Sequence, residues 1–138
     1  MKNKKMKVAI YCRVGQSDQA EIEKQKNKIQ EYCKEQGFEV FKCYMDNGYS
    51  ANDKTRPGYN LMLEDMKQKK FDMIITSNIC RLHRSIIDFE DFINLIKKHN
   101  CDLNVLNENV NTSTSIGAFF IRFLTIFVKL EKELLVNE

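Results

Sequence analysis

Short apolar segments that favour β-strands alternate along this chain with longer segments of helical periodicity, and this alternation constrains its fold most strongly. The strand-like segments are residues 7–14, 38–46, 71–77 and 101–107. Strands separated by helices form βαβ units, in which the strands lie parallel in one sheet. The sequence therefore predicts an α/β fold, in which helices flank a central, mainly parallel β-sheet of about four to five strands.

Helical segments fill the intervals between these strands. Residues 19–36 have helical character, and Gly37 follows as a C-terminal stop. Apolar residues at the spacing i, i+3, i+4 and i+7 indicate a second helix, and these are Tyr59, Met62, Leu63 and Met66. Residues 85–98 resume the same periodicity. Polar segments join these elements, and we expect loops at 47–58, 78–84 and 108–115.

The composition limits the class of protein. With 138 residues, 43% of them hydrophobic, the chain is long enough for one domain with its own core. Its five cysteines are an odd number without a C-x-x-C pair, which favours reduced thiols over a disulfide framework. The basic start, MKNKKMK, is not followed by an apolar signal segment. We therefore expect a cytoplasmic location.

Metal and nucleotide motifs are weak or missing. Cys80 and His83 form a C-x-x-H pair, but no second pair accompanies it, so we expect no metal site. Neither G-x-G-x-x-G nor G-x-x-x-x-G-K-[ST] occurs, so a nucleotide-binding domain is a weak interpretation. The sequence implies no small-molecule cofactor.

Arginines gather where predicted strands end. Arg13 closes the first strand, Arg56 lies in the loop after the second, and Arg81 and Arg84 follow the third. The carboxyl ends of parallel strands share one edge of a sheet, where ligand sites collect. A single loop arginine is usually a solvated charge, but four on one edge favour an anionic substrate, since guanidinium groups match phosphate oxygens in pairs. The net charge of +3 does not by itself indicate nucleic-acid binding.

The segment 115–135 predicts a long last helix that is apolar on nearly every side. Its apolar stretch, 116–128, is too short for a membrane span and contains Arg122. One sheet face covers only one stripe of a helix, so we expect the remainder to form an oligomer interface, with a plain core helix as the alternative. The aromatic residues expected at this interface are Phe119, Phe120, Phe123 and Phe127.

Four segments of the chain, in order, resemble the catalytic domain of the serine recombinases, the resolvase/invertase family, and most closely the large serine integrases and transposon recombinases. VAIYCRVGQSDQ resembles the opening Y-x-R-V-S-[ST]-x-x-Q of the family, and DNGYSANDKTRPGY its D-x-G-x-S-(x)-R-P-x loop. SNICRLHRS resembles its L-[DS]-R-[LF]-[GS]-R segment. NENVNTSTSIGAFFIRFLTIFVKLEKELL resembles the run into its long helix. The likeness covers essentially residues 1–138.

The resemblance implies site-specific DNA recombination without metal or ATP. In the family, a serine hydroxyl attacks the scissile phosphodiester, leaving a 5′-phosphoseryl link and a free 3′-hydroxyl, which later reverses the step. Arginines hold the non-bridging oxygens and stabilise the developing charge. By position, Arg13, Arg56, Arg81 and Arg84 match the family's arginines, expected to bind DNA, and Gln19 and Gln25 match its site glutamines. Arg81 and Arg84 would share a face if their segment is helical.

The nucleophile position of the family falls on Gly15, which has no side chain, so the chain as written is expected to be defective in cleavage. Ser17 lies two residues away, up to roughly 7 Å, which is too far for in-line attack without a register slip. Cys12 points to the other face of its strand. Cys80 and His83 also depart from the family pattern, and packed side chains are the favoured interpretation over a substitute Cys–His nucleophile pair.

Two interpretations of different classes follow. The first is a recombinase catalytic domain that dimerises, or forms a tetramer, through its last helix and binds DNA phosphate, but lacks its nucleophile. The second is a non-catalytic module that pairs with itself or with an active recombinase as a regulatory subunit. Nothing in residues 1–138 resembles the C-terminal DNA-binding domains of the family, so we expect weak DNA binding with little sequence preference.

Overall fold

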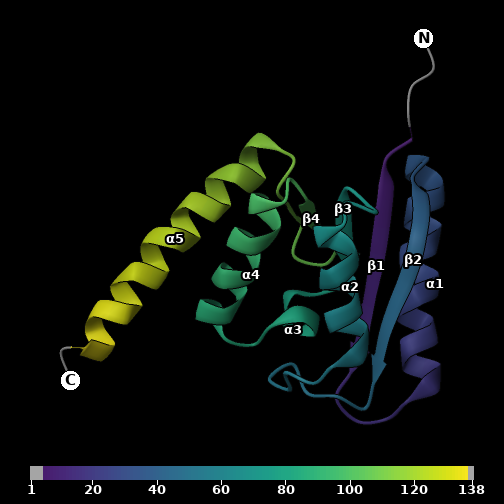
Figure 1. Ribbon diagram of the computed structural model, residues 1–138, viewed down its shortest axis with the longest axis horizontal. Coiled ribbons are helices and arrows are strands. Elements are labelled where there is room, and N and C mark those ends of the chain that lie inside the picture. Colours follow the sequence, from purple (N-terminus) through teal and green to yellow (C-terminus); the bar gives the residue numbers. More distant parts are fainter. Residues whose placement is uncertain (1–4, 137–138) are drawn as a thin grey trace.

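A computed structural model describes residues 5–136 of the chain. The strands are β1 (Lys7–Val14), β2 (Glu39–Asn47), β3 (Met73–Thr76), β4 (Asp102–Val105) and β5 (Val110–Asn111). The helices are α1 (Gln19–Gln36), α2 (Pro57–Lys67), α3 (Ile79–Leu82), α4 (Ile86–Lys98) and α5 (Ser115–Val136). The helices and strands alternate as the sequence predicts (Figure 1).

The strands form one five-stranded sheet in the order β2-β1-β3-β4-β5. β1 pairs in parallel with β2 and β3, and β3 pairs in parallel with β4. β5 is antiparallel to β4. It has only two residues, and these lie within the expected loop 108–115. The expected α/β class with a mainly parallel sheet is confirmed.

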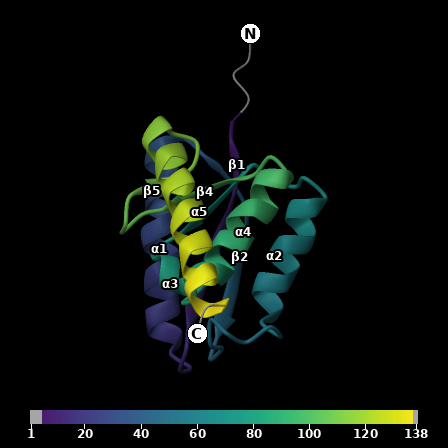
Figure 2. The same ribbon diagram turned by 90° about the vertical axis from the view of Figure 1, so that its left-hand side faces the viewer.

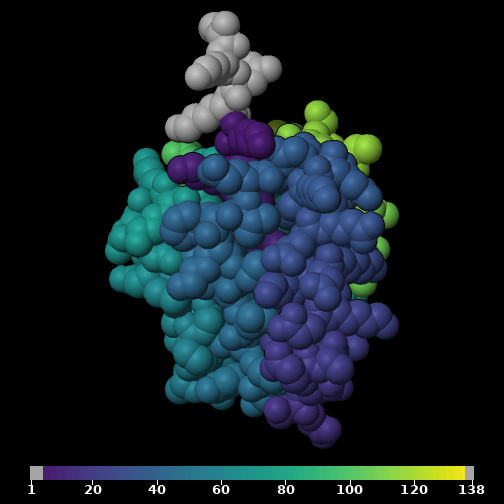
Figure 3. All heavy atoms as spheres, turned by 90° about the vertical axis from the view of Figure 1, so that its right-hand side faces the viewer, coloured from purple at the N-terminus to yellow at the C-terminus, as the bar shows by residue number. Residues whose placement is uncertain are grey.

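Helices cover both faces of the sheet and form two separate cores. On one face, α1 packs Ile22, Ile29 and Cys33 against Val8 and Ile10 of β1. Figure 3 shows this side of the molecule, with α1 and the edge strand β2 next to each other at the surface. On the other face, α2 and α4 cover the sheet and build the larger core. Parallel strands buried on both faces account for the continuous apolar sequence of β1 and β3.

Local signals explain where the helices begin and end. Asp18 caps α1 by accepting a hydrogen bond from the Glu21 backbone nitrogen at 3.1 Å. Gly37 adopts a left-handed conformation with φ of 75°, which confirms it as the C-terminal stop. Ser85 caps α4 through the Asp88 backbone nitrogen. The segment 78–84, expected to be a loop, contains the single-turn helix α3.

The helix α5 forms an outer layer, packed on α4 and directed away from the sheet (Figures 1 and 2). Ile121, Leu124 and Val128 are buried and join the larger core. Near the start of α5, Gly117 lies so close to β5 that an added Cβ would overlap the Asn111 carbonyl oxygen. Within residues 5–136, no helix is both long enough and apolar enough to cross a membrane.

The opposite side of α5 exposes a row of large apolar side chains. Phe119, Phe123 and Phe127 are 69%, 62% and 48% exposed, as the expected interface requires. Phe120, expected with them, is half-buried and packs against the larger core of its own chain. Phe120 lies beside Ile86 and Phe89 of α4, so it differs from the other three phenylalanines expected at the interface.

Candidate active site at the carboxyl edge of the sheet

The loops that follow β1, β2 and β3 meet at the lower edge of the sheet in Figure 1. The parallel pairing of these strands brings their carboxyl ends together, so Arg13 of β1 lies opposite Asp46 of β2. α3 follows β3 at the same edge. Gly15, Arg56 and Arg81 therefore all lie in segments at this edge.

Arg13 is buried, and its guanidinium donates to backbone carbonyls of the loop after β2 and of α3. Its Nε donates to the Arg81 carbonyl, its Nη1 to the Tyr49 carbonyl and its Nη2 to the Cys80 carbonyl, each at 2.8 Å. Burial, and then the neighbouring guanidinium groups of Arg56 and Arg81, lower the pKa of Arg13. Three carbonyl acceptors hold the charge in place, so Arg13 ties the loop after β2 to the segment after β3.

Arg56 is also buried and lies over the ring of Tyr59, with its guanidinium carbon 4.0 Å from the ring centroid. Its Nη1 donates to the Tyr11 hydroxyl at 3.1 Å and to the Arg81 carbonyl at 3.3 Å. The Arg81 carbonyl therefore accepts from both Arg13 and Arg56. This shared acceptor fixes the two guanidinium groups relative to each other.

Asp46, which was not among the expected site residues, lies at the same edge and binds groups of β1 and α2. Its fully buried carboxylate accepts from the Tyr11 hydroxyl at 2.7 Å and from the backbone nitrogens of Gly58 and Tyr59 at 2.7 and 2.9 Å. Those nitrogens belong to the first turn of α2, whose partial positive charge stabilises an anion. Gly58 is required here because an added Cβ would meet the Met45 carbonyl at 2.9 Å. An acidic residue at the end of an apolar strand is the sequence signal that could have identified Asp46.

Arg81 has a buried side-chain nitrogen that lacks a hydrogen-bond partner among the described residues. Its backbone carbonyl is occupied, but its side-chain Nε is buried and has no hydrogen-bond partner. A buried guanidinium nitrogen without an acceptor is costly, and an anion bound at this edge would supply one. The arrangement therefore suits an oxyanion held beside Arg81.

Arg84 is exposed at the rim of this edge, outside the hydrogen bonds that link Arg13, Arg56 and Arg81. It follows His83, whose backbone is extended with φ of −148° and ψ of 143°, so Arg84 lies outside α3. Its side chain is exposed and lines a shallow apolar pocket with Phe120 and Leu124 of α5. The condition under which Arg81 and Arg84 would share a helical face is therefore not met, because the helix ends at Leu82.

Gly15 is exposed immediately after β1 and has room for a side chain. An added Cβ would lie 3.7 Å from Nη1 of Arg13, an ordinary van der Waals contact, and would meet no other group within 4 Å. Its φ lies outside the left-handed region, so the backbone accepts an L-residue. Ser17 is also exposed but lies beside Gly48 of the loop after β2.

The two glutamines have different surroundings. Gln25 is buried on α1, and its carboxamide accepts from the Arg13 backbone nitrogen and donates to the Arg13 carbonyl, at 3.2 and 3.1 Å. It therefore holds the end of β1 against α1. Gln19 is exposed at the start of α1, where it accepts from Asn47 and donates to Glu23.

Cys12 and His83 occupy packed positions, whereas Cys80, which was expected to be packed, is exposed. Cys12 is fully buried in the core beneath α1, and burial raises the pKa of its thiol to about 12. His83 packs edge-on to Tyr59, and its Nε2 lies 2.8 Å from the Tyr59 hydroxyl. Burial, and then Arg56, lower the pKa of His83 to about 4, so the ring is neutral near pH 7. Cys80 is exposed, and its carbonyl accepts from Arg13.

Known proteins share the family and the fold of this chain. The family model described as Resolvase, N terminal domain, matches residues 8–138. The N-terminal catalytic domain of TP901-1 integrase is similar in structure, with a TM-score of 0.88 and 32% identity over 93% of this chain and 98% of that chain. A resolvase family site-specific recombinase from Streptococcus pneumoniae shares the fold, with a TM-score of 0.82 and 24% identity over 96% of this chain and 92% of the other.

A curated relative extends the comparison to a phage. The "Uncharacterized immunity region protein 3" of Bacillus phage phi105 is 43% identical over 65 residues, covering 44% of this chain and 79% of that protein. The family match covers nearly the whole chain, and the structure is similar to that of a recombinase catalytic domain. The chain belongs to the resolvase family of serine recombinases, as a member of its N-terminal domain group.

Proposed function

We propose that this chain is a serine recombinase catalytic domain that binds a DNA phosphodiester at the carboxyl edge of its sheet but cannot cleave it. The observation that carries the proposal is the convergence of Arg13, Arg56 and Arg81 beside Gly15, with the Nε of Arg81 buried and unpaired. Guanidinium groups fixed before the ligand arrives stabilise a developing oxyanion without reorganising. This is the arrangement that phosphoryl transfer requires.

The arginines divide into two roles in this proposal. Arg13 and Arg56 have donated most of their hydrogen bonds to the protein, so they hold the loops and contribute positive charge. Arg81 retains a free donor, and Arg84 is exposed at the rim, so these two contact the phosphate oxygens. Gln25 keeps the end of β1, and with it Gly15, in register with Arg13.

The missing component is the nucleophile. Glycine has no atom to attack phosphorus, and the neighbouring cysteine, Cys12, is buried with its thiol pKa raised to about 12. The space at Gly15 is nevertheless open, and an added side chain would start 3.7 Å from the Arg13 guanidinium. In this proposal the chain therefore lacks one reacting group, the nucleophilic hydroxyl, and keeps the arginines that surround its position.

Restoring a hydroxyl at this position tests the proposal. In Gly15→Ser, the serine Oγ is expected to form a bond to phosphorus while the bond to the 3′-oxygen breaks, and the 3′-oxygen takes up a proton. The readout is an SDS-resistant adduct on duplex DNA labelled at the 3′ end, since that label remains on the strand joined to the protein through its 5′-phosphate. Gly15→Ala is the matched control, because it adds the same Cβ without a hydroxyl.

The same DNA is offered to both variants as a pool of randomised duplexes, so that no particular site is assumed. An adduct with Gly15→Ser and none with Gly15→Ala supports the proposal. If Gly15→Ser binds duplex DNA at the arginine edge, as shown by amide shifts at Arg81, yet forms no adduct, the cleavage geometry has been lost. The regulatory alternative then becomes the better account.

The alternative function, a non-catalytic pairing module, is favoured by the exposed apolar face of α5. Phe119, Phe123 and Ile126 are each more than 60% exposed, which is unusual for a helix of a monomeric domain. We propose that this face pairs with a second copy as a homodimer, or within a tetramer, or with an active recombinase. Mixing the chain with the N-terminal catalytic domain of TP901-1 integrase tests the mixed pair by sedimentation equilibrium. Finding only self-association would count against the regulatory role.

A further inference from the structure

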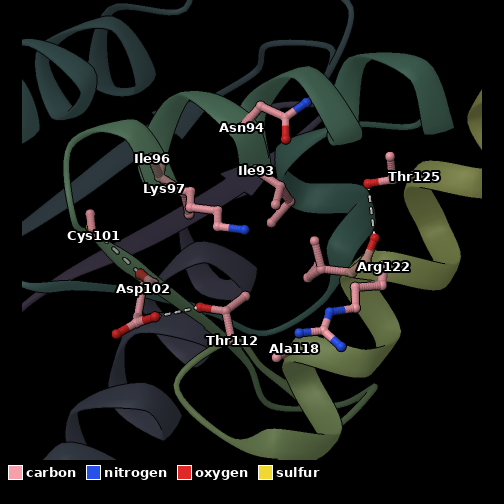
Figure 4. Close-up of a pocket in the computed structure, with 11 residues that line it drawn as sticks. Ile93, Asn94, Ile96, Lys97, Cys101, Asp102, Thr112, Ala118, Arg122 and Thr125 are labelled. Carbon is pink, nitrogen blue, oxygen red and sulfur yellow. Dashed lines mark hydrogen bonds between the residues drawn. The ribbon is translucent and has the colours of Figure 1, made fainter.

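A second basic site lies at the opposite end of the molecule, in a cavity between α4 and α5 (Figure 4). The cavity has a volume of about 240 Å³ and opens to solvent. Its floor includes Asp102, the first residue of β4, so it lies at the amino end of the parallel strands. The arginines of the candidate active site lie at the carboxyl end. The two basic sites are therefore separated by the length of the sheet.

Two cationic side chains enter this cavity from facing walls. Figure 4 shows the Lys97 side chain extending from α4 across the opening, and the Arg122 side chain extending from α5 back toward the sheet. Neither forms a salt bridge with any residue of the described range 5–136. Both side chains are exposed, and an anion bound in the cavity would be attracted to both positive charges.

The cavity lining also contains one acidic residue, Asp102. An oxygen of the Asp102 carboxylate accepts a hydrogen bond from the Thr112 hydroxyl at 2.8 Å, which directs it along the floor. Thr125 donates its hydroxyl to the Ile121 carbonyl of its own helix at 3.0 Å. Asn94 of α4 also lines the cavity, and its side-chain nitrogen donates to Oε2 of Glu90 at 2.6 Å. The guanidinium of Arg122 and the ammonium of Lys97 are therefore the cationic groups of the lining, and Asp102 is its carboxylate.

From this arrangement we propose that the cavity between α4 and α5 binds a phosphate group through Lys97 and Arg122. The planar guanidinium of Arg122 contacts two oxygens of a tetrahedral oxyanion, and the ammonium of Lys97 approaches a third as a point charge. A water molecule occupies about 30 Å³ of liquid, so the cavity has room for a phosphate and a small attached group. A ligand bound this way bridges α4 to α5.

Inorganic phosphate is the probe that tests the site. We expect its titration, at constant ionic strength in chloride, to shift the backbone amide resonances of Lys97, Thr112 and Arg122 along a saturable curve. Shifts at Arg81 report the candidate active site separately, so binding at one site is not mistaken for binding at the other. Arg122→Gln and Lys97→Gln are each expected to weaken the cavity binding about tenfold or more, as the loss of a charge-assisted hydrogen bond predicts.

Lys129→Gln is the matched control, since it removes a positive charge from α5 outside the cavity and is expected to leave the curve unchanged. Duplex DNA then distinguishes the sources of the phosphate. If DNA shifts the same cavity resonances, the ligand is the DNA backbone, whereas a shift with inorganic phosphate alone identifies a free phosphate or small ester. Linear, unsaturated shifts that persist in Arg122→Gln would overturn the proposal, because they show only general screening of surface charge.

Discussion

At the carboxyl edge of the sheet, Arg13 donates to three backbone carbonyls and Asp46 accepts from three donors. On the outer face of α5, by contrast, Phe119 and Phe123 are 69% and 62% exposed. It is costly to leave polar groups without hydrogen bonds or large apolar side chains in solvent, and each region contains one of these two kinds of group. The first satisfies them internally, and the second leaves its apolar surface in solvent.

This contrast separates the part of the molecule that its own contacts hold in place from the part for which we propose a second chain. The edge holds Gly15, Arg13 and Arg81 in position through its own hydrogen bonds, so its geometry should survive in an isolated chain. The α5 face lacks such contacts, and under the proposed function a second chain covers it. Substitutions in the two regions should therefore change different quantities, folding stability for the edge and association for the helix.

The largest effect is expected where α5 is anchored. Gly117→Ala places a Cβ against the Asn111 carbonyl, which is backbone and cannot rotate away, so the start of α5 must shift. We expect a loss of at least about 3 kcal/mol in the free energy of unfolding, measured by urea denaturation.

Gly37→Ala provides the control for this prediction. Gly37 has a φ of 75° but nothing within 4 Å of an added Cβ, so it tests strain without overlap and should cost only about 1 kcal/mol. Equal losses in the two variants would mean that the close approach of α5 to β5 contributes nothing of its own.

The carboxyl edge provides the second prediction. Arg13→Ala removes the donor to the carbonyls of Tyr49, Cys80 and Arg81 and leaves them in a part-buried site. The free energy of unfolding should fall by about 2–3 kcal/mol. Arg84→Ala, at an exposed position on the same edge, should change it by less than about 0.5 kcal/mol. A similar loss in both variants would refute the division between framework and rim arginines.

The third prediction concerns the outer face of α5. Phe123→Lys should weaken self-association about 30-fold, because it places a charge in an apolar interface, while the free energy of unfolding of the monomer changes little. Sedimentation equilibrium measures the first quantity and urea denaturation the second. Leu61→Lys, at an exposed apolar position of α2, is the control and should leave association unchanged. Association that is insensitive to Phe123 would place the interface elsewhere.

The smallest effect is a pH dependence from His83. Its pKa is lowered to about 4 in the folded chain and lies near 6.5 in an unfolded one, so the unfolded state binds more protons between these values. Stability should therefore decline by about 1 kcal/mol as the pH falls from about 6.5 to about 4, allowing for the partial exposure of the ring. Urea denaturation at several pH values measures it.

His83→Phe should flatten this part of the pH profile, because a phenyl ring fills the same aromatic cluster without titrating. His99→Gln removes the other histidine, which lies at the end of α4 outside the cluster, and should leave the slope as it is. A slope that persists in His83→Phe would assign the proton uptake to another group.

Much of the fold could be predicted because it depends on local pattern. The continuous apolar runs at β1 and β3 identified buried parallel strands, and Gly37 marked the end of α1. Two short elements were missed for a physical reason. β5 has only two residues, and its existence depends on pairing with β4 rather than on its own sequence. α3 is a single turn whose extent is too short for a periodic signal.

For the candidate site, too, the sequence predicted some properties and not others. The positions of Arg13, Arg56 and Arg81 after successive strands predicted that they share one edge, since parallel strands end together. Their roles could not be predicted, because the carbonyls that accept from Arg13 come from residues 36 and 68 positions away. Asp46 was missed for the same reason: its partners are a tyrosine of another strand and the first turn of a helix.

The sequence by itself determined the α/β class, the edge at which the arginines gather, the glycine at position 15 and the apolar character of the last helix. These properties follow from periodicity and from residue type at fixed positions. Tertiary structure alone decided which arginines are committed and which retain a donor, that Phe120 faces inward, and that Lys97 and Arg122 meet in one cavity. Such outcomes depend on contacts between segments far apart in the chain, and no local pattern encodes the orientation of α5 on α4.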